Sequence, residues 1–451
     1  MENTRRIALE TLLEAEKEKV KSDRVFHAVL DKYSYLEKQE LSFLSRLLNG
    51  TLERKLELDY IIGSFSSVKV EKLKPVIRMI LRLGVYELLY MDAVPEGATV
   101  NEAVKLCEKK GFRGLKGFVN GVLRSVSRNK AAIVYPDKAT APIEYLSVRY
   151  SVPAFIVKKL TNAYGEEIAE AVCRAQLESR PVFIRTNESW ISKEELQRYL
   201  NKEGIQTEPA PYIQTALQVK EPDRIAASQT FQEGLFGISD LSSMLAVSLA
   251  GIRNGDQVLD ICAAPGGKTC HVLDILRGSG EVISRDISER KTELIRENVT
   301  RQRFTGNIRI EEADALVYDA GLYERFDVVI ADLPCTGLGV MGRKKDIKYR
   351  LREEDFTTLA DLQRKILSVA ISYIKPGGTL LYSTCTIDRC ENEDNFRYIA
   401  TELGLKPVPL TKALPRELLC ESAEEGYIQL LPGVHASDGF FIARFQKREG
   451  A

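Results

Sequence analysis

The C-terminal half of the sequence repeats one pattern, in which a short apolar run is followed by a turn and then usually by a helical stretch. The apolar runs lie at residues 257–262, 281–285, 308–311, 326–331 and 379–383. Short apolar runs that alternate with helices are typical of a mostly parallel sheet with helices on both faces. In such a sheet, ligands bind beyond the carboxyl ends of the strands. The pattern therefore predicts a doubly wound α/β domain over residues 231–451, with a site in the loops that follow its strands.

The rest of the chain follows different patterns. In residues 1–130, apolar side chains recur every three or four positions, which predicts an all-α domain of about six helices. Residues 131–142 lose this periodicity and contain two prolines, as a linker does. Residues 143–230 mix helical stretches with the strand-like run 182–186, so we expect a small α+β module there.

The charge of the chain is balanced overall but not locally. The 64 basic residues equal the 64 acidic ones, so total charge gives no reason to expect a polyanionic partner. Residues 1–130, however, carry 24 basic and 18 acidic side chains, a net charge of +6. The acid-free stretch near their end contains Arg113, Lys116, Arg124 and Arg128. Such a patch fits either a nucleic-acid-binding surface or an ordinary solvated face.

The cysteine and histidine content limits the possible chemistry. Eight scattered cysteines indicate reduced thiols, as in a cytoplasmic protein. Three histidines and no Cys-x-x-Cys pair predict that the chain has no metal site. The N-terminal segment lacks the apolar core of a signal peptide, and the apolar stretch 79–91 is interrupted by Arg82 and Glu87. We therefore expect neither export nor a membrane span.

The loop after the first apolar run has two interpretations. Residues 262–269 read Cys-Ala-Ala-Pro-Gly-Gly-Lys-Thr, which differs from the phosphate-binding motif G-x-x-x-x-G-K-[ST] only in having Cys262 in place of the first glycine. A later apolar run ends at Asp332, as the magnesium-binding strand of nucleoside triphosphatases ends in an aspartate. One interpretation is therefore a nucleotide hydrolase.

The other interpretation is a nucleoside cofactor without a triphosphate. Pro265 removes a backbone N–H that a phosphate would need, whereas Gly266 and Gly267 allow a ligand to approach the backbone closely. Asp286, at the end of the second run, can accept hydrogen bonds from a ribose diol. Asp314 follows the third run, where an adenine amino group is expected. These features favour S-adenosylmethionine.

Two cysteines follow neighbouring apolar runs. Cys335 lies in Asp-Leu-Pro-Cys-Thr-Gly at residues 332–337, and Cys385 lies in Ser-Thr-Cys-Thr at residues 383–386. A free cysteine is usually a small buried hydrophobe, but two thiols at neighbouring strand ends would meet over one crevice. Cytosine methylation needs a thiol there, because C5 becomes nucleophilic only after a thiolate adds to C6. Asp332 could bind the N3/N4 edge of the base and stabilise the developing charge.

In combination, these motifs resemble a known family. Residues 259–269, 326–337 and 382–387 are similar to the Sun/Fmu group of bacterial 16S ribosomal RNA cytosine-5 methyltransferases, within the Nol1/Nop2/Sun RNA methyltransferases. Residues 49–54, 81–86 and 117–124 resemble the NusB-type RNA-binding domain that distinguishes this group. The resemblance implies a NusB-like all-α RNA-binding domain, a small α+β RNA-binding module and a C-terminal Rossmann-like methyltransferase domain.

The resemblance also implies roles for individual residues. Cys385 would be the nucleophile, and Cys335 would assist release of the methylated base. Asp286, Asp314 and Asp332 would hold S-adenosylmethionine. They would act with the loop formed by Cys262, Ala263, Ala264, Pro265, Gly266, Gly267 and Lys268. The implied target is cytosine 967 of 16S ribosomal RNA, modified in the cytoplasm.

A second basic stretch lies within the predicted methyltransferase domain. This stretch, residues 343–350, contains the basic residues Arg343, Lys344, Lys345, Lys348 and Arg350, and Tyr349 lies among them. This composition suits phosphate contacts beside a stacked base, although a solvated charge run is the alternative. A chain that only binds RNA, as a scaffold with an inert methyltransferase fold, is a further alternative. The paired cysteines argue against it, because a scaffold has no need of them.

Overall fold

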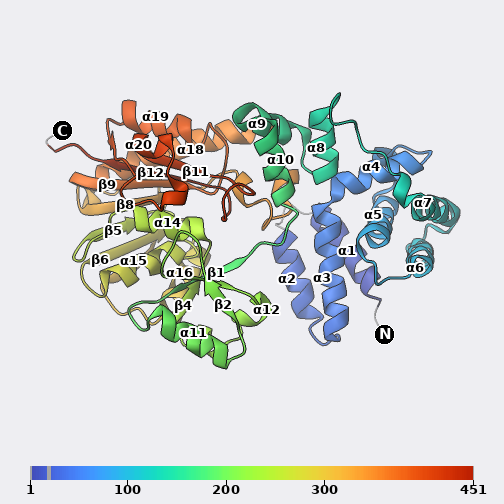
Figure 1. Cartoon of the computed structure of the whole chain (residues 1–451), viewed down its shortest axis with the longest axis horizontal. Helices are drawn as coiled ribbons and strands as arrows, with labels where there is room; N and C mark the ends of the chain where they lie inside the picture. Colours follow the sequence, from blue (N-terminus) through green and yellow to red (C-terminus); the bar gives the residue numbers. More distant parts are fainter. Residues whose placement is uncertain (1–2, 18–21, 450–451) are drawn as a thin grey trace. The chain divides into compact units, whose positions relative to one another are not determined.

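The computed structural model describes residues 3–17 and 22–449 (Figure 1). The chain forms two compact units. Unit 1 comprises Met1–Leu177 and Met341–Arg350, and unit 2 comprises Glu178–Val340 and Leu351–Ala451. The short stretch Met341–Arg350 therefore belongs to a different unit from the residues on either side of it in the sequence.

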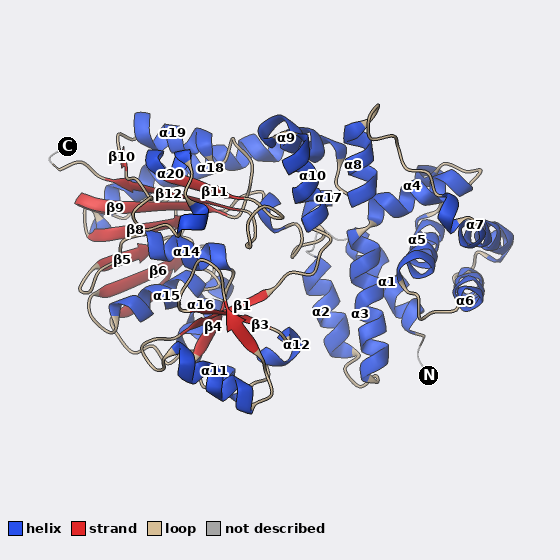
Figure 2. Cartoon of the chain, in the orientation of Figure 1, coloured by secondary structure: helices blue, strands red, loops and turns tan. Residues whose placement is uncertain are grey.

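Unit 1 is built from helices (Figure 2). Its N-terminal part contains α1 (Thr4–Lys17), α2 (Ser22–Lys32), α3 (Lys38–Glu53), α4 (Lys55–Phe65), α5 (Pro75–Tyr90), α6 (Glu96–Lys109) and α7 (Lys116–Arg128). Helix α5 is central, because it contacts α1, α3, α4, α6 and α7 and buries side chains around most of its circumference. The predicted all-α domain is confirmed, with seven α-helices among the described residues where the pattern predicts about six.

Three further helices and a segment distant in sequence complete unit 1. They are α8 (Pro142–Tyr150), α9 (Ala154–Tyr164), α10 (Glu166–Ala175) and the single turn α17 (Ile347–Arg350). The α+β module expected over residues 143–230 is thus divided: α8, α9 and α10 lie in unit 1, whereas the strands and the helix α11 (Lys193–Lys202) lie in unit 2. The physical reason is that α8 packs on α4, while Gln176, just after α10, hydrogen-bonds with Lys348 of α17.

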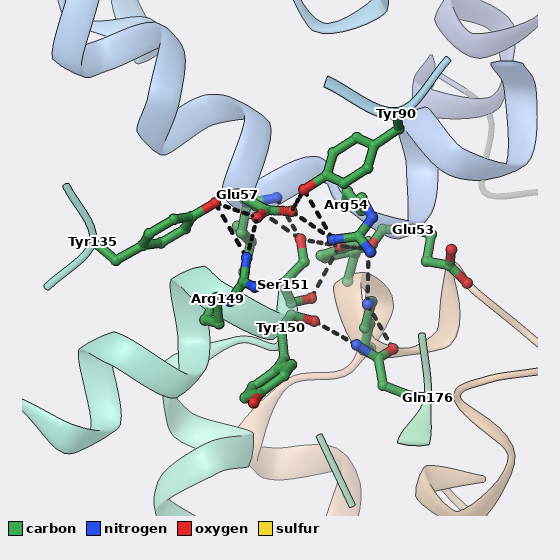
Figure 3. A network of polar contacts seen from close by, with 12 residues as sticks. Glu53, Arg54, Glu57, Tyr90, Tyr135, Arg149, Tyr150, Ser151 and Gln176 are labelled. Atoms are coloured by element: carbon green, nitrogen blue, oxygen red, sulfur yellow. Dashed lines mark hydrogen bonds and ion pairs between the residues drawn. The ribbon is translucent and has the colours of Figure 1, made fainter. Parts of the chain in front are cut away.

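A buried carboxylate connects several parts of unit 1 (Figure 3). Glu57 of α4 is fully buried and accepts hydrogen bonds from Arg54, Tyr90 and Tyr135 at 2.8, 2.7 and 2.6 Å. The guanidinium of Arg149, on α8, lies 3.4 Å from the same carboxylate. Because a buried charge is stable only with such partners, Glu57 fixes α4 against α5, α8 and the segment between α7 and α8.

Unit 2 is organised around a large twisted sheet. Its strands are β5 (Gln257–Asp260), β6 (Glu281–Asp286), β7 (Ile308–Glu312), β8 (Phe326–Asp332), β9 (Ile374–Thr384), β10 (Lys406–Pro407), β11 (Tyr427–Leu430) and β12 (Phe440–Gln446). They are ordered β10-β12-β9-β8-β5-β6-β7, and β11 pairs with β12. Strands β5 to β9 are parallel, as predicted, whereas β12 runs antiparallel to β9.

Helices cover both faces of this sheet (Figure 1). On one face lie α14 (Leu241–Leu249), α15 (Gly267–Leu276) and α16 (Glu289–Arg301), and on the other lie α18 (Glu353–Ala370) and α19 (Glu393–Thr401). Successive strand residues point to opposite faces, so Val258 packs in the first core and Leu259 in the second. Both faces are therefore apolar, which explains why the strands appear as continuous apolar runs.

A smaller antiparallel sheet forms the other part of unit 2. Its strands are β1 (Val182–Thr186), β2 (Thr207–Pro209), β3 (Ala216–Val219) and β4 (Phe236–Ile238), in the order β2-β3-β1-β4. Helix α11 (Lys193–Lys202) begins at a capping box formed by Ser192 and Glu195. Arg185 of β1 forms a buried ion pair with Asp274 of α15, which attaches the small sheet to the large domain.

Candidate active site

The loop between β5 and α15 has a backbone that only glycine can provide. Gly266 has a φ of +98°, and a Cβ there would lie 3.1 Å from the backbone of Ile295 on α16. Asn298, also on α16, donates a hydrogen bond of 2.9 Å to the carbonyl of Pro265. The loop is therefore held close against α16, with Gly267 opening α15.

Asp286 joins this loop to the end of the next strand. Its side chain is buried, and one carboxylate oxygen accepts a hydrogen bond of 2.9 Å from the backbone N–H of Ala264. The other oxygen accepts from the N–H of Ile287 and from Lys291, whose Nζ lies 2.7 Å away. The structure thus brings together two features predicted from sequence, the 262–268 loop and the carboxylate after β6.

Asp314 lies on the neighbouring strand end. It follows β7, is exposed, and accepts a hydrogen bond of 2.9 Å from the N–H of Leu316. The preceding residue, Ala313, donates its N–H to the carbonyl of Asp286. Asp314 and Asp286 therefore lie on adjoining backbone segments at the carboxyl edge of the sheet.

The threonine that ends the loop motif points into the protein interior. Thr269 is fully buried, and its hydroxyl lies 2.9 Å from both Asp260 and Ser284. In a phosphate-binding loop the corresponding hydroxyl coordinates magnesium, which this buried position prevents. Burial also raises the pKa of Asp260 to about 7. The geometry therefore disfavours the nucleotide hydrolase.

Asp332 connects the loop with the neighbouring strand. One of its carboxylate oxygens lies 2.6 Å from Nζ of Lys268, and the other accepts a hydrogen bond of 2.8 Å from Ser383. Asp332 and Ser383 are paired in register at the ends of β8 and β9. We did not predict a role for Ser383, and its only signal in the sequence is its position two residues before Cys385.

The two cysteines follow these strands and meet. The sulfur atoms of Cys335 and Cys385 lie 3.2 Å apart. The contact with Cys385 and burial together raise the pKa of the Cys335 thiol well above its usual value. A thiol that keeps its proton beside a second sulfur can donate a hydrogen bond to a thiolate on its neighbour. The pair therefore suits chemistry in which one sulfur reacts and the other supports it.

The basic residues selected from the sequence differ in their surroundings. Arg113, Lys116, Arg124 and Arg128 are all exposed, on α7 and the turn before it. Arg343, Lys344 and Arg350 are also exposed. Lys348 is the exception and corrects our expectation of a surface phosphate contact. It is fully buried in unit 1, because its Nζ donates hydrogen bonds to the carbonyl of Glu53 and to Gln176, at 2.9 and 2.7 Å.

Among residues 3–17 and 22–449, no group of three or more His, Cys, Asp or Glu side chains is arranged to hold a metal ion. No helix in the same ranges is long and apolar enough to cross a membrane.

Three protein families match successive parts of the chain. Residues 2–128 match the NusB family. Residues 152–226 match the ferredoxin-like domain of RsmF/B-like methyltransferases, and residues 247–446 match the family described as 16S rRNA methyltransferase RsmB/F. The domain order is the one that the sequence motifs imply.

Curated relatives and a solved structure agree with these matches. The chain is 35% identical to the probable ribosomal RNA small subunit methyltransferase B of Bacillus subtilis, over 99% of both chains. It is 31% identical to ribosomal RNA small subunit methyltransferase B of Klebsiella pneumoniae, over 91% of each. A methyltransferase homologue from Pyrococcus horikoshii is 28% identical with a TM-score of 0.60, over 68% of this chain and 99% of that one. The chain therefore belongs to the ribosomal RNA small subunit methyltransferase B family.

Proposed function

We propose that this chain transfers a methyl group from S-adenosylmethionine to C5 of a cytosine in 16S ribosomal RNA, with cytosine 967 as the target. The relatives' names support a ribosomal RNA substrate. The observation that carries the cytosine-C5 assignment is the contact of 3.2 Å between the sulfurs of Cys335 and Cys385, next to Asp332. This arrangement supplies the thiol that cytosine C5 chemistry requires.

The loop after β5 and the carboxylates beside it suit a nucleoside. Gly267 has open space where a Cβ would lie, which leaves the loop accessible to close approach, and the Asp286 carboxylate suits ribose hydroxyls while repelling phosphate. Asp314 lies on the adjoining segment and would bind the adenine amino group. When bound, S-adenosylmethionine supplies an electrophilic methyl group. The chain's own residues hold it and present the base.

Cys385 acts on the base. Its thiolate forms a bond to C6 of the cytosine, which shifts electron density to C5 and the N3 side of the ring. C5 can then form its bond to the methyl carbon, whose bond to the sulfonium sulfur of the donor would break, with S-adenosylhomocysteine as the leaving group. Loss of the C5 proton to solvent restores the C5–C6 double bond as the bond between C6 and sulfur breaks, which returns the Cys385 thiolate.

Cys335 and Asp332 assist this sequence. Because the raised pKa of Cys335 keeps its proton in place, the thiol can donate a hydrogen bond to the departing sulfur of Cys385. That bond stabilises the thiolate and so favours release of the product. Asp332, held by Lys268 and Ser383, presents a fixed carboxyl group to the N3/N4 edge of the base.

The exposed basic side chains are proposed to contact the RNA backbone. Arg113, Lys116, Arg124 and Arg128 belong to the region that matches the NusB family. Arg343, Lys344 and Arg350 are exposed in the segment of unit 1 that follows Val340 in the sequence. Contacts of this kind position RNA without reading its sequence.

Methyl transfer from radiolabelled S-adenosylmethionine to unmodified 16S ribosomal RNA tests the proposal directly. Wild type should label C5 of one cytosine, Cys385→Ala should transfer no label, and Cys335→Ala should accumulate protein covalently attached to RNA through Cys385. Mapping the labelled nucleotide identifies the target. Transfer by wild type to an atom other than cytosine C5 would contradict the proposal, as would full activity of Cys385→Ala.

A further inference from the structure

A buried glutamate holds the residue that follows Cys335. Glu391 is fully buried in the turn before α19. One of its carboxylate oxygens accepts a hydrogen bond of 3.0 Å from the backbone N–H of Thr336, and the other accepts from the Thr336 hydroxyl. Burial raises the pKa of Glu391 to about 7. Since a backbone N–H can only donate, the first contact persists in both protonation states of the carboxyl group.

The residue that precedes Cys335 is held in the same way. Gln363 of α18 donates one hydrogen bond of 2.8 Å to the carbonyl of Pro334 and another of 3.0 Å to Glu391. The oxygen of Gln363 is occupied by Tyr382 and Asn395, so its orientation is determined. The peptide groups on both sides of Cys335 are therefore fixed by one buried pair, Glu391 and Gln363.

Asn392, the residue after Glu391, holds the residues on either side of Cys385. Asn392 is fully buried, and its amide oxygen accepts a hydrogen bond of 2.6 Å from the hydroxyl of Thr384. Its amide nitrogen donates 3.1 Å to the carbonyl of Thr386 and 2.7 Å to Gln429. Asn392 thus holds the residues on both sides of Cys385.

We infer that Glu391 and Asn392 are positioning residues for two different steps: Glu391 places Cys335 for release of the methylated base, and Asn392 places Cys385 for attack on C6. The inference rests on the proposed function, because it assigns these two steps to the two cysteines. The supports are joined, since the hydroxyls of Thr336 and Thr386 lie 2.8 Å apart. Two consecutive residues therefore set the spacing of the two sulfurs.

The experiment compares substitutions at these positions in the full-length chain. Glu391→Ala and Asn392→Ala are assayed for methyl transfer to 16S ribosomal RNA and for covalent protein–RNA adduct on denaturing gels, with Cys335→Ala as the reference for adduct. Glu393→Ala serves as the matched control, because Glu393 is the next residue and the charged groups that act on its carboxyl group are Arg389, Asp394 and Asp388.

The two substitutions should fail in opposite ways. Glu391→Ala should lower kcat roughly 10- to 100-fold, as expected for misplaced catalytic groups, and accumulate adduct as Cys335→Ala does. Asn392→Ala should lower methyl transfer and accumulate no adduct. Glu391→Gln keeps an oxygen for the Thr336 N–H and should restore turnover. The double variant Glu391→Ala/Cys335→Ala should behave as Cys335→Ala alone, since both changes affect one step.

Three contrary results would each overturn a different part of the proposal or the same part in a different way. If Cys335→Ala traps adduct but Glu391→Ala loses transfer without trapping any, the step assignment of Glu391 is overturned while the proposed function stands. If Cys335→Ala itself traps no adduct, the covalent step of the proposed function fails, and the assignment fails with it. Equal losses in Glu391→Ala and Glu391→Gln would also overturn the inference, because the carbonyl oxygen of glutamine would then not replace the carboxylate.

Discussion

Nζ of Lys268 lies 2.6 Å from a carboxylate oxygen of Asp332, so a residue of the cofactor loop is paired directly with a residue of the proposed base site. Lys268 lies in the first turn of α15, which follows β5, and Asp332 ends β8, the neighbour of β5 in the sheet. The ion pair thus connects the loop that would hold the methyl donor with the carboxyl group that would hold the acceptor. A change at either partner should affect both substrates.

Replacement of Lys268 by methionine tests this connection. The variant keeps an aliphatic side chain but leaves Asp332 without its cationic partner, and the contact with Ser383 alone remains. We expect kcat/KM for methyl transfer to fall at least tenfold, which corresponds to about 1.4 kcal/mol. Steady-state assays at varied S-adenosylmethionine and varied RNA give the two KM values. Unchanged kinetics for both substrates would show that the pair has no role in catalysis.

Asp286→Asn should weaken cofactor binding. The amide retains one oxygen but loses the charge that strengthens hydrogen bonds to ribose hydroxyls and to the N–H of Ala264. Titration calorimetry should show the Kd for S-adenosylmethionine rising by roughly 10- to 100-fold, in line with the loss of one or two charge-assisted bonds. Glu312→Gln is the control, because it neutralises an exposed carboxylate at the end of β7. Equal Kd values for Asp286→Asn and the control would contradict the assignment.

The sheet and the residues at its carboxyl edge were predictable because their sequence signals are local. Strands buried on both faces appear as continuous apolar runs, and parallel strands bring the residues after them to one edge. This logic correctly places Asp286 beside the 262–268 loop and Cys335 beside Cys385. The antiparallel strand β12 was not predicted. It pairs with β9, but the two strands are far apart in the sequence and no hairpin turn joins them, so the sequence carries no local signal for this pairing.

Long-range burial of polar groups was not predictable. Lys348 appears in the sequence as part of a basic run, yet its hydrogen-bond acceptors, Glu53 and Gln176, lie 295 and 172 residues away. The same holds for Glu391, whose partner Thr336 is 55 residues distant. Composition alone cannot distinguish a solvated charge from one with buried partners, since the difference depends on tertiary contacts.

Glu57→Ala should destabilise unit 1 strongly. The substitution leaves the polar groups of Arg54, Tyr90 and Tyr135 without their common acceptor (Figure 3). Loss of one partner from a buried charged network costs about 3–5 kcal/mol. Urea unfolding followed by circular dichroism should show one transition moved to lower urea. The control Glu71→Ala, at an exposed position of unit 1, should leave that transition in place. A shift below about 1 kcal/mol would mean that the network contributes little.

Lys348 should make the stability of unit 1 depend on pH. Burial lowers its pKa to about 7, whereas an unfolded lysine titrates near about 10.4. Between these values the unfolded chain binds one more proton than the folded chain, so stability should rise with pH across the window. A neutral amine has two N–H groups, which match its two acceptors, Glu53 and Gln176.

The comparison of wild type with Lys348→Met isolates this contribution, because other titrating groups are common to both proteins. The urea transition that Glu57→Ala shifts is measured from about pH 7 to about pH 9.5, within the window set by the two pKa values. The wild-type free energy of unfolding should increase relative to the methionine variant as pH rises. Lys109→Met, at an exposed lysine of α6, should show no such trend. A difference that stays flat or falls with pH would mean that the buried amine remains charged in the folded protein.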